Sequence, residues 1–516
     1  MSLLQSHLLM TLGLICLVRC ENLVMMPFDH VSHVNFFVVT AHTLVKEGHS
    51  VTFVIAPRHK KTLDKHGLNY ITYDSVNGDK SDDSRKAIEN DVFEENKEPV
   101  SLMTTLSTIK NLVDNQKVDV LGDKGLKQQM DATEFNLAII DGTLFCRYLY
   151  VLAYRHSIPY ITLTASDDPL ASGVTGLPSV QPLPAFWFTD NMSVTQRVIN
   201  TFAQFMALNV LPAVLYPNSI ITEYAPNKPA VSMDFLYKQS ELVLVNLQDV
   251  CLDYPRVTAP HYQMVGGMGA HHPHPLPENI ESFIQGAKDG IVIMTFGSIF
   301  SKMPDRVLKK FFDAFKVFPK LRFIMRNSET TLKVPDNVLP LNWLPQNDIL
   351  GHPKTILFIS HGGNNGQLEA VYHGVPTLTF PLFGDQFSNA VRMRVKGFGL
   401  DLQMKTFTTE SLTQNLIELT TNDTYRNKIK RCSAIVKEQT PAQEKVAHWV
   451  RHVLKYGSDH LKSHSIDMPL YQLLLLDVMC IMMLGLGIVS LLLTCCCRMV
   501  ISKSCCRSGR KKIKSE

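Results

Sequence analysis

The sequence predicts an α/β protein with two parallel-sheet halves, a linker between them and one membrane-spanning helix near the carboxyl end. Three observations support this expectation. Short apolar runs alternate with helical patterns in both halves, the stretch between the halves is rich in Pro, Gly and His, and one long uncharged segment precedes a basic tail. Strands that alternate with helices form parallel sheets covered on both faces. With 516 residues, 45% of them hydrophobic, the chain is long enough for two such domains.

The first domain is expected over residues 21–253. A helical pattern over 32–46 follows the first apolar run and ends before Gly48, a residue type that commonly follows the last turn of a helix. Other helices are expected within 100–132, 144–156 and 190–238. The apolar runs that predict buried strands lie at 23–26, 51–55, 137–140, 158–163 and 242–246.

The second domain is expected over residues 281–470, where the same alternation restarts. Its strands are expected at 291–296, 322–325, 356–359 and 377–380, and its clearest helices at 305–315 and 366–372. Two facing α/β halves place a ligand cleft between them, beyond the carboxyl ends of their strands.

The linker is expected over residues 254–280 and contains the run His271-His272-Pro273-His274. Imidazoles bind metals, but a histidine run in a linker most often has no such role, so we expect no metal here. The histidines at 30, 33, 42 and 49 have no Cys or carboxylate at ligand spacing, and no metal is expected there either.

Both ends of the chain carry targeting signals. Residues 1–20 are expected to form a signal peptide, because the apolar run from Leu8 to Val18 leads to a tolerable cleavage site after Cys20. A buried first strand is the alternative. The sequons at Asn191 and Asn422 are expected to carry N-glycans if the body is exported.

Residues 473–497 are expected to cross a membrane, because they approach the ~20 apolar residues that span hydrocarbon. The tail over 498–516 holds seven Lys/Arg and one Glu, and the positive-inside rule places it in the cytoplasm. Its lysines at 512 and 514 resemble a signal for return to the endoplasmic reticulum. The expectation is a single-pass type I protein of that membrane, with its body in the lumen.

Charge and cysteine content exclude other classes. The net charge of +4 resides in the tail and leader, which leaves the body slightly acidic, so we expect no nucleic-acid partner. Away from the two ends only Cys146, Cys251 and Cys432 remain, an odd and widely spaced set, so neither a disulfide framework nor a metal cluster is expected.

The chemistry is expected at a glycine-rich turn over 360–366, which opens a helix after a buried strand. Glycines such as Gly363 let the backbone approach a ligand, and the helix amino end offers unpaired N–H groups, a suitable cradle for a diphosphate. His361 adds a hydrogen-bonding group. Glu369, further along the helix, is suited to ribose hydroxyls, and Trp343 to stacking on a base.

Several ordered blocks together resemble the UDP-glycosyltransferases, of the animal UDP-glucuronosyltransferase type. The blocks are WLPQND (343–348), FISHGGNNGQLEA (358–370), HGVP (373–376), PLFGDQ (381–386), SHVNFF (32–37), EGH (47–49), LDYPR (252–256), VGG (265–267) and FGS (296–298). The resemblance covers nearly the whole chain. It implies a GT-B fold, in which two Rossmann-like domains face a cleft, with the sugar donor held by the second domain and the acceptor by the first.

The resemblance also implies residue roles for the donor. Trp343 is expected to stack on uracil, Gln346 to bond to the nucleoside and Glu369 to hold the ribose. The diphosphate contacts are expected from Ser298, His361, Asn365 and Gly366, and the sugar hydroxyl contacts from Asp385 and Gln386. Gly366 stands where plant relatives have a serine, so one hydroxyl contact is lost there and the backbone N–H is kept.

The catalytic base implied by the resemblance is His33, and its orienting acid is Asp141. Both follow a buried strand, where open α/β sheets place their sites. A histidine at a helix amino end is favoured in its neutral form, and an aspartate beside it fixes the tautomer and stabilises the imidazolium that forms. Attack opposite the leaving UDP inverts the anomeric carbon and gives a β-glycoside.

We expect a membrane-bound enzyme that moves glucuronic acid from UDP to hydroxyls of small lipophilic acceptors, with no cofactor besides this co-substrate. UDP-glucose or another UDP-hexose is the alternative donor. A silent regulatory relative is disfavoured, because His33, Asp141, His361 and Glu369 are intact. The acceptor depends on residues 60–220, where Phe186-Trp187-Phe188 line a pocket or belong to the core. Nothing in the sequence decides between a monomer and a homo- or hetero-oligomer.

Overall fold

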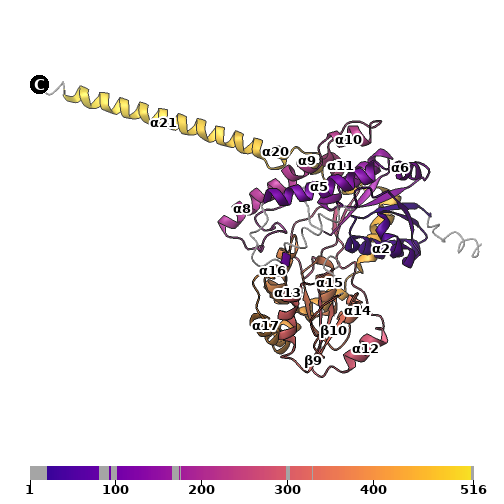
Figure 1. Ribbon diagram of the computed structural model, residues 1–516. Helices are drawn as coiled ribbons and strands as arrows, with labels where there is room; N and C mark the ends of the chain where they lie inside the picture. Colours follow the sequence, from indigo (N-terminus) through magenta and orange to yellow (C-terminus); the bar gives the residue numbers. More distant parts are fainter. Residues whose placement is uncertain are drawn as a thin grey trace, which may run out of the picture. The chain divides into compact units, whose positions relative to one another are not determined.

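Two parallel sheets organise the chain in a computed structural model that describes residues 20–78, 80, 92–93, 102–165, 174, 176–297, 303–327 and 329–512. The first sheet has the strand order β3-β2-β1-β4-β5-β6-β7, and the second the order β10-β9-β8-β11-β12-β13. Figure 1 shows the first half in indigo to magenta and the second half in orange to brown. The α/β class that the alternation predicts is confirmed. The expected signal peptide falls almost wholly outside the described residues.

The first sheet buries most of its central strands, because their side chains are largely apolar on both faces. Val24 and Met26 of β1 face one core, and Leu23 and Met25 face the other. Helices cover both faces, as parallel sheets require. The strands are β1 (Asn22–Met26), β2 (Ser50–Ile55), β3 (Asn69–Thr72), β4 (Leu137–Asp141), β5 (Tyr160–Thr164), β6 (Val243–Val245) and β7 (Tyr262–Met264).

The helices of the first half include α2, which ends before Gly48, as the glycine predicts; Gly48 has a φ of +96°. The helices and turns are α2 (Val31–Lys46), η1 (Pro57–His59), α3 (Lys60–His66), α5 (Leu102–Leu121), α6 (Lys124–Asp131), η2 (Leu144–Cys146), α7 (Leu149–Arg155), α8 (Val194–Phe205), η3 (Met206–Val210), α9 (Leu211–Leu215), α10 (Ser219–Tyr224) and α11 (Met233–Lys238).

The second half repeats the same plan. Its strands are β8 (Gly290–Thr295), β9 (Leu321–Arg326), β10 (Val338–Leu341), β11 (Thr355–Ser360), β12 (Thr377–Thr379) and β13 (Gly399–Asp401). Its helices are α12 (Glu278–Gln285), α13 (Asp305–Phe315), α14 (Gln346–Leu350), α15 (Asn364–His373), α16 (Gln386–Lys396), α17 (Thr409–Thr421) and α18 (Asp423–Lys437).

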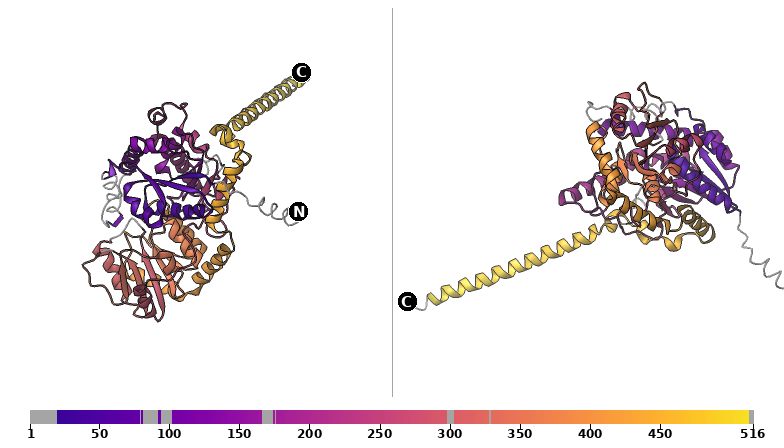
Figure 2. Two further views of the ribbon diagram at one scale, coloured as in Figure 1. Left: turned by 90° about the vertical axis from the view of Figure 1, so that its right-hand side faces the viewer. Right: turned by 90° about the horizontal axis from the view of Figure 1, so that it is seen from below.

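The second domain was expected to extend to residue 470. The helix α19 (Ala442–Tyr456) lies within that range but packs on the first half. Its Val446, Ala447 and Val450 lie in the same core as Phe37 and Ala41 of α2. The chain therefore returns to the first half, since the apolar face of α2 needs a cover that the second half does not supply. Figure 2 shows this golden helix beside the indigo half. The linker also differs from expectation, because β7 lies within it and completes the first sheet.

A disulfide joins Cys251 to Cys432, with Cα atoms 5.8 Å apart. The expectation of no disulfide was wrong, because spacing along the chain does not show which residues meet after folding. Cys251 lies between β6 and β7 of the first half, and Cys432 lies on α18 of the second half. The bond therefore links the two halves covalently.

The residues from Ser463 form a separate unit, with η5 (His464–Ile466), α20 (Leu470–Leu473) and α21 (Leu476–Lys512). Within α21, Leu476–Ile501 is apolar, with a mean hydropathy of 2.5, and is long enough to cross a bilayer. The expected apolar carboxyl-terminal helix is therefore present. It begins after the expected residue 473, because Leu475 has a φ of +55° and separates α20 from α21.

Candidate active site

His33 and Asp141 contact each other at one edge of the first sheet. β1 and β4 are neighbours that pair Met26 with Ile140, so the chain leaves both strands at the same edge. His33 lies in the first turn of α2, and its Nδ1 is 2.7 Å from Oδ2 of Asp141. The imidazole is 18% exposed and the carboxylate fully buried. The fold thus brings together the two residues named as base and partner.

Asp141 is oriented by backbone donors as well as by His33. The N–H of Phe28 donates to its Oδ2 at 3.2 Å, and the N–H of Thr143 donates to its Oδ1 at 2.9 Å. Burial raises the pKa of this carboxyl, but His33 and Thr143 outweigh burial and hold the pKa below its ordinary value. Asp141 is therefore an anion at neutral pH. Because it engages Nδ1, Nε2 is the nitrogen of His33 that can accept a proton.

In the second half, His361 lies in the glycine turn between β11 and α15. A Cβ on Gly363 would lie 2.5 Å from Nε2 of His361, and a Cβ on Gly297 would lie 2.7 Å from its Cε1, so both positions need glycine. Burial lowers the pKa of His361 to about 4, so the ring is neutral. Its Nδ1 is sealed from solvent and has no hydrogen-bond partner among the described residues. A buried, unpartnered nitrogen beside a helix amino end fits a polar ligand such as a phosphate.

Gln346 and Glu369 meet one helical turn further on. The Gln346 Nε2 donates to Oε2 of Glu369 at 2.6 Å. Gly366 lies beside this pair, since a Cβ there would be 3.5 Å from the same Nε2. Burial raises the pKa of Glu369 to about 7, with Gln346 acting in the opposite direction and Asp348 in the same one. This carboxyl therefore changes charge near neutral pH.

Trp343 is 59% exposed, which is unusual for so large an apolar side chain. The guanidinium of Arg326 lies 5.2 Å from the centroid of its ring. An indole held by a cation and open to solvent is suited to stacking on a planar ring.

Asp385 immediately precedes α16 and accepts a hydrogen bond from Asn389 Nδ2 at 2.8 Å. Burial raises the pKa of Asp385, while Asn389, Arg392 and His33 act in the opposite direction. The influence of His33 means that the base of the first half lies within electrostatic range of Asp385 in the second half.

A buried polar chain that was not predicted from the sequence leads from Asp253, at the end of the first half, to Asp385. Arg392 donates to Asp253 Oδ1 at 3.1 Å and to Asn389 Oδ1 at 2.7 Å, and Asn389 in turn bonds to Asp385. All four side chains are at least partly buried. The LDYPR block contained Asp253, but nothing in the sequence paired it with Arg392, which lies 139 residues away.

Two predicted donor residues make other contacts in this structure, and one cannot be placed. Asn365 Oδ1 accepts from Asn246 Nδ2 at 3.3 Å, across the two halves. Gln386 Oε1 accepts from the N–H groups of Leu382 and Phe383 at 2.9 and 3.3 Å, so it shapes the turn before α16. Ser298 lies outside the described residues.

Phe186, Trp187 and Phe188 are neither core residues nor isolated at the surface. All three are partly exposed. The ring of Trp187 lies 5.3 Å from that of Phe387 on α16, the residue after Gln386. This aromatic segment of the first half therefore contacts the second half beside the residues expected to hold the sugar.

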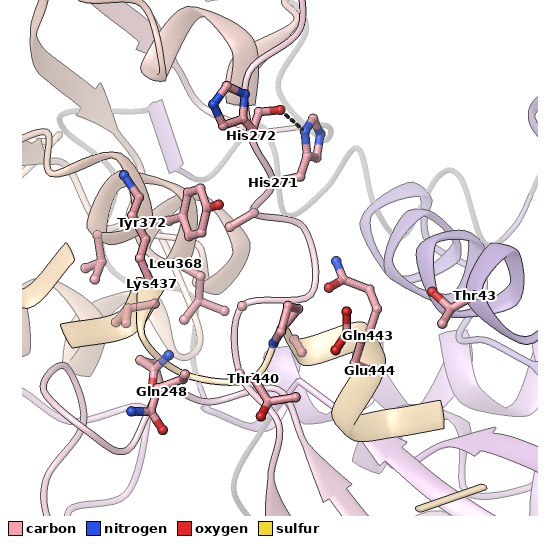
Figure 3. Close-up of a pocket in the computed structure, with 18 of the residues that line it drawn as sticks. Thr43, Gln248, His271, His272, Leu368, Tyr372, Lys437, Thr440, Gln443 and Glu444 are labelled. Carbon is pink, nitrogen blue, oxygen red and sulfur yellow. Dashed lines mark hydrogen bonds between the residues drawn. The ribbon is translucent and has the colours of Figure 1, made fainter. Parts of the chain in front are cut away.

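A cavity of about 750 Å³ lies elsewhere, behind α15 and between the ends of α2, α18 and α19. Figure 3 shows its lining, with Tyr372 and Leu368 from α15 on one side, Gln443 and Glu444 from α19 on another, and His271 and His272 at the upper end. None of the predicted catalytic or donor residues that the structure describes lines it. The cavity is therefore distinct from the candidate active site.

The fold and this site define a GT-B glycosyltransferase. A solved glycotransferase of kitacinnamycin aligns with a TM-score of 0.59 and 18% identity, over 84% of this chain and 99% of that structure. The calicheamicin glycosyltransferase CalG4 aligns with a TM-score of 0.58 and 16% identity, over 85% and 99%. These likenesses concern the fold.

The sequence model of the family described as "UDP-glucoronosyl and UDP-glucosyl transferase" matches residues 21–512, and the chain belongs to this family. UDP-glucuronosyltransferase 3A1 of Xenopus laevis is 33% identical over 75% of this chain and 74% of its own length. The human 2-hydroxyacylsphingosine 1-beta-galactosyltransferase is 29% identical over 91% and 86%. The protein is a glycosyltransferase that takes a UDP-sugar as donor, as the resemblance implied.

Proposed function

We propose that the protein transfers glucuronic acid from UDP to hydroxyl groups of small lipophilic acceptors, with His33 as base and Asp141 as its partner. The observation that carries this proposal is the bond of 2.7 Å between the two side chains, at an edge where the His33 charge reaches Asp385 of the other half. The influence of the His33 charge on Asp385 supports a base that lies near the donor half.

In this mechanism Nε2 of His33 accepts the proton of the acceptor hydroxyl while the oxygen attacks the anomeric carbon. The bond from that carbon to the UDP oxygen breaks from the opposite side, so an α-linked donor gives a β-glycoside. The Asp141 carboxylate stabilises the imidazolium. The N–H groups at the start of α15 and the neutral ring of His361 stabilise the negative charge of the leaving diphosphate.

The same geometry supports roles for the other donor residues. Trp343 stacks on uracil, the Gln346–Glu369 pair holds the nucleoside and ribose, Gly363 and Gly366 offer backbone N–H groups, and Asp385 binds sugar hydroxyls. Asn365 must break its hydrogen bond with Asn246 before its side chain contacts the diphosphate. Gln386 uses its Oε1 in the turn before α16, and its Nε2 binds the sugar. Ser298 is proposed as a diphosphate contact on the resemblance alone.

A neutral hexose is the second candidate donor sugar. A glucuronate carboxylate favours a cation nearby, and the basic side chains that act on Asp385 are Arg392 and His33, of which His33 must be neutral to serve as the base. Arg392 is already bonded to Asp253, and His33 to Asp141. The name of the galactosyltransferase relative also shows that a neutral hexose is used within the similar proteins.

Membranes from cells that express the protein test both candidates. Each of UDP-glucuronic acid, UDP-glucose, UDP-galactose and UDP-N-acetylglucosamine is supplied separately with a panel of phenols and steroids, and products are scored by mass. A gain that corresponds to a glucuronosyl group supports the first candidate. A hexosyl product instead favours the second, and no product with any donor contradicts the proposed function.

We also propose that α21 anchors the protein in the endoplasmic reticulum, with its amino-terminal body in the lumen. The basic residues that follow the apolar segment support this orientation. Asn191 is exposed, whereas Asn422 caps α18 and its Nδ2 donates to Glu418 at 2.8 Å, so Asn191 is the better glycan acceptor. Replacing Asn191 with Gln should remove a glycosidase-sensitive mass shift; a wild-type protein without any such shift would contradict a lumenal body.

A further inference from the structure

The histidine run of the linker meets a carboxylate that comes from a distant part of the chain. His271, His274 and Asp348 each offer one ligand atom, and these three atoms lie within 4.8 Å of one another. Asp348 belongs to α14, 74 residues after His274. It is the only such group of three among the residues that the structure describes. The histidine run alone predicted no metal, and the fold adds the oxygen ligand of Asp348.

The backbone around the three side chains is held in place. The side chain of Asn347 accepts from the N–H of His271 at 3.2 Å and donates to its carbonyl at 3.0 Å. Asp348 Oδ1 accepts from the N–H of His274 at 2.9 Å. Each imidazole is therefore tied to α14 through its own backbone.

The ring of His271 also has an outer partner of the kind that metal-binding histidines use. Its Nδ1 lies 2.8 Å from the carbonyl oxygen of His272, as the dashed line in Figure 3 shows. The same Nδ1 lies 3.0 Å from Nδ2 of Asn347. In the tautomer whose Nδ1–H donates to the carbonyl, the lone pair is on Nε2, the state in which an imidazole ligates a metal. The ring of His272 lies on the other side of the linker.

We propose that His271, His274 and Asp348 bind a divalent transition-metal ion, with Zn²⁺ the best match. Two imidazoles and a carboxylate are ligands that Zn²⁺ accepts, and solvent supplies the fourth position. The His274 side chain is 71% exposed, so an ion reaches the site from water and this ring can rotate to close the ligand distances. The site fastens the linker to α14 at the rim of the cavity of Figure 3.

Two histidine pairs provide an internal comparison. His42 and His66 approach to 3.1 Å, and His452 and His460 to 3.0 Å. Neither pair belongs to a group of three ligands in the described part of the chain. Two ligands bind an ion more weakly than three, so the linker site should be occupied first.

Full-length protein in detergent, purified through a tag without histidine, tests the proposal by competition with a chromophoric zinc chelator. Wild type should bind one equivalent of Zn²⁺ more tightly than the rest. His274→Ala and Asp348→Asn should each weaken this equivalent by about tenfold or more. His272→Ala is the matched control and should bind as wild type does.

The proposal is overturned if His274→Ala and Asp348→Asn retain the tight equivalent, or if His272→Ala loses it as well. Melting temperatures without metal separate ligand loss from misfolding: all three variants should match wild type under chelation, and Zn²⁺ should raise the melting temperature of wild type and His272→Ala alone. A variant that melts early without metal is replaced by His274→Gln, for which the same loss of binding is expected.

Discussion

At the scale of single residues, burial sets the charge of the candidate site as strongly as neighbouring charges do. It raises the pKa of Glu369 to about 7 and raises that of Asp385, while it lowers that of His361 to about 4. Asp141 is the exception, because the bond to His33 outweighs its burial. The first half therefore carries a fixed anion behind its base, whereas in the second half burial favours the uncharged forms of His361, Glu369 and Asp385.

Removal of the base should abolish transfer without affecting the donor. His33→Ala is expected to reduce kcat by about 10²–10⁴-fold, because the variant lacks the group proposed to take the hydroxyl proton. Asp141→Asn should lower kcat by a comparable or larger factor, because the amide no longer fixes the tautomer or stabilises the imidazolium. UDP affinity, measured by calorimetry, should remain that of wild type in both.

Trp343→Ala is the matched opposite for these variants. It should weaken UDP binding by about tenfold, the size of a lost aromatic stack, and leave turnover at saturating donor nearly unchanged.

Wild-type turnover by His33→Ala would contradict the role of His33 as the catalytic base.

The charge of Glu369 should make nucleoside affinity depend on pH. As pH rises through about 7, the carboxyl loses its proton and becomes a stronger acceptor for ribose hydroxyls, so affinity for uridine should increase between pH 6 and 8. Uridine is the suitable probe because it has no phosphate that titrates in this range. Glu369→Gln should bind uridine with no such dependence; an identical pH profile would assign the titration to another group.

At the scale of elements, the strands that were not predicted from the sequence are those at the edges of the two sheets. The missed strands are β3, β7, β10 and β13, which are the four edge strands of the two sheets. Edge strands are short and half exposed, so they have no continuous apolar run. In contrast, β4, β5 and β8 are buried throughout and β1 is buried from Leu23 onward, so these strands were evident. The glycine turn and both catalytic candidates could be found because they follow such buried strands.

Contacts between distant elements could not be predicted in the same way. The bonds from Arg392 to Asp253, from Asn246 to Asn365 and between Cys251 and Cys432 depend on how two separately patterned halves meet. No local periodicity encodes that arrangement.

The disulfide between Cys251 of the first half and Cys432 of α18 should stabilise the native body. Cys251→Ser combined with Cys432→Ser is expected to lower the free energy of unfolding by about 2–4 kcal/mol, the usual value for a native disulfide. Thermal unfolding followed by intrinsic fluorescence provides the measurement. A thiol reductant should lower the melting temperature of wild type and leave the double variant unchanged; equal sensitivity of the two proteins would contradict the bond.

At the scale of the whole molecule, α19 makes the first half depend on residues beyond the second half. Three of its valines, at 446, 450 and 453, are buried in the first half's core. Each buried valine contributes about 1.5–3 kcal/mol, and the net stability of a domain is about 5–15 kcal/mol. The stability of the first half therefore depends on a helix that follows the second half in the chain.

Truncation should separate these contributions. A chain that ends after Lys462 keeps α19 and should fold and bind UDP without its apolar anchor. A chain that ends after Lys437 keeps both sheets and should be unstable or insoluble. Secretion yield and UDP-dependent thermal shift measure the difference, and equal behaviour of the two truncations would show that α19 is dispensable.

The position of α19 also bears on biosynthesis. A ribosome delivers residues 442–456 only after the whole second half has been made, so the apolar face of α2 stays uncovered during most of translation. A premature stop anywhere before that point releases a polypeptide with an exposed apolar surface on α2. Chaperones retain such species, and quality control degrades them.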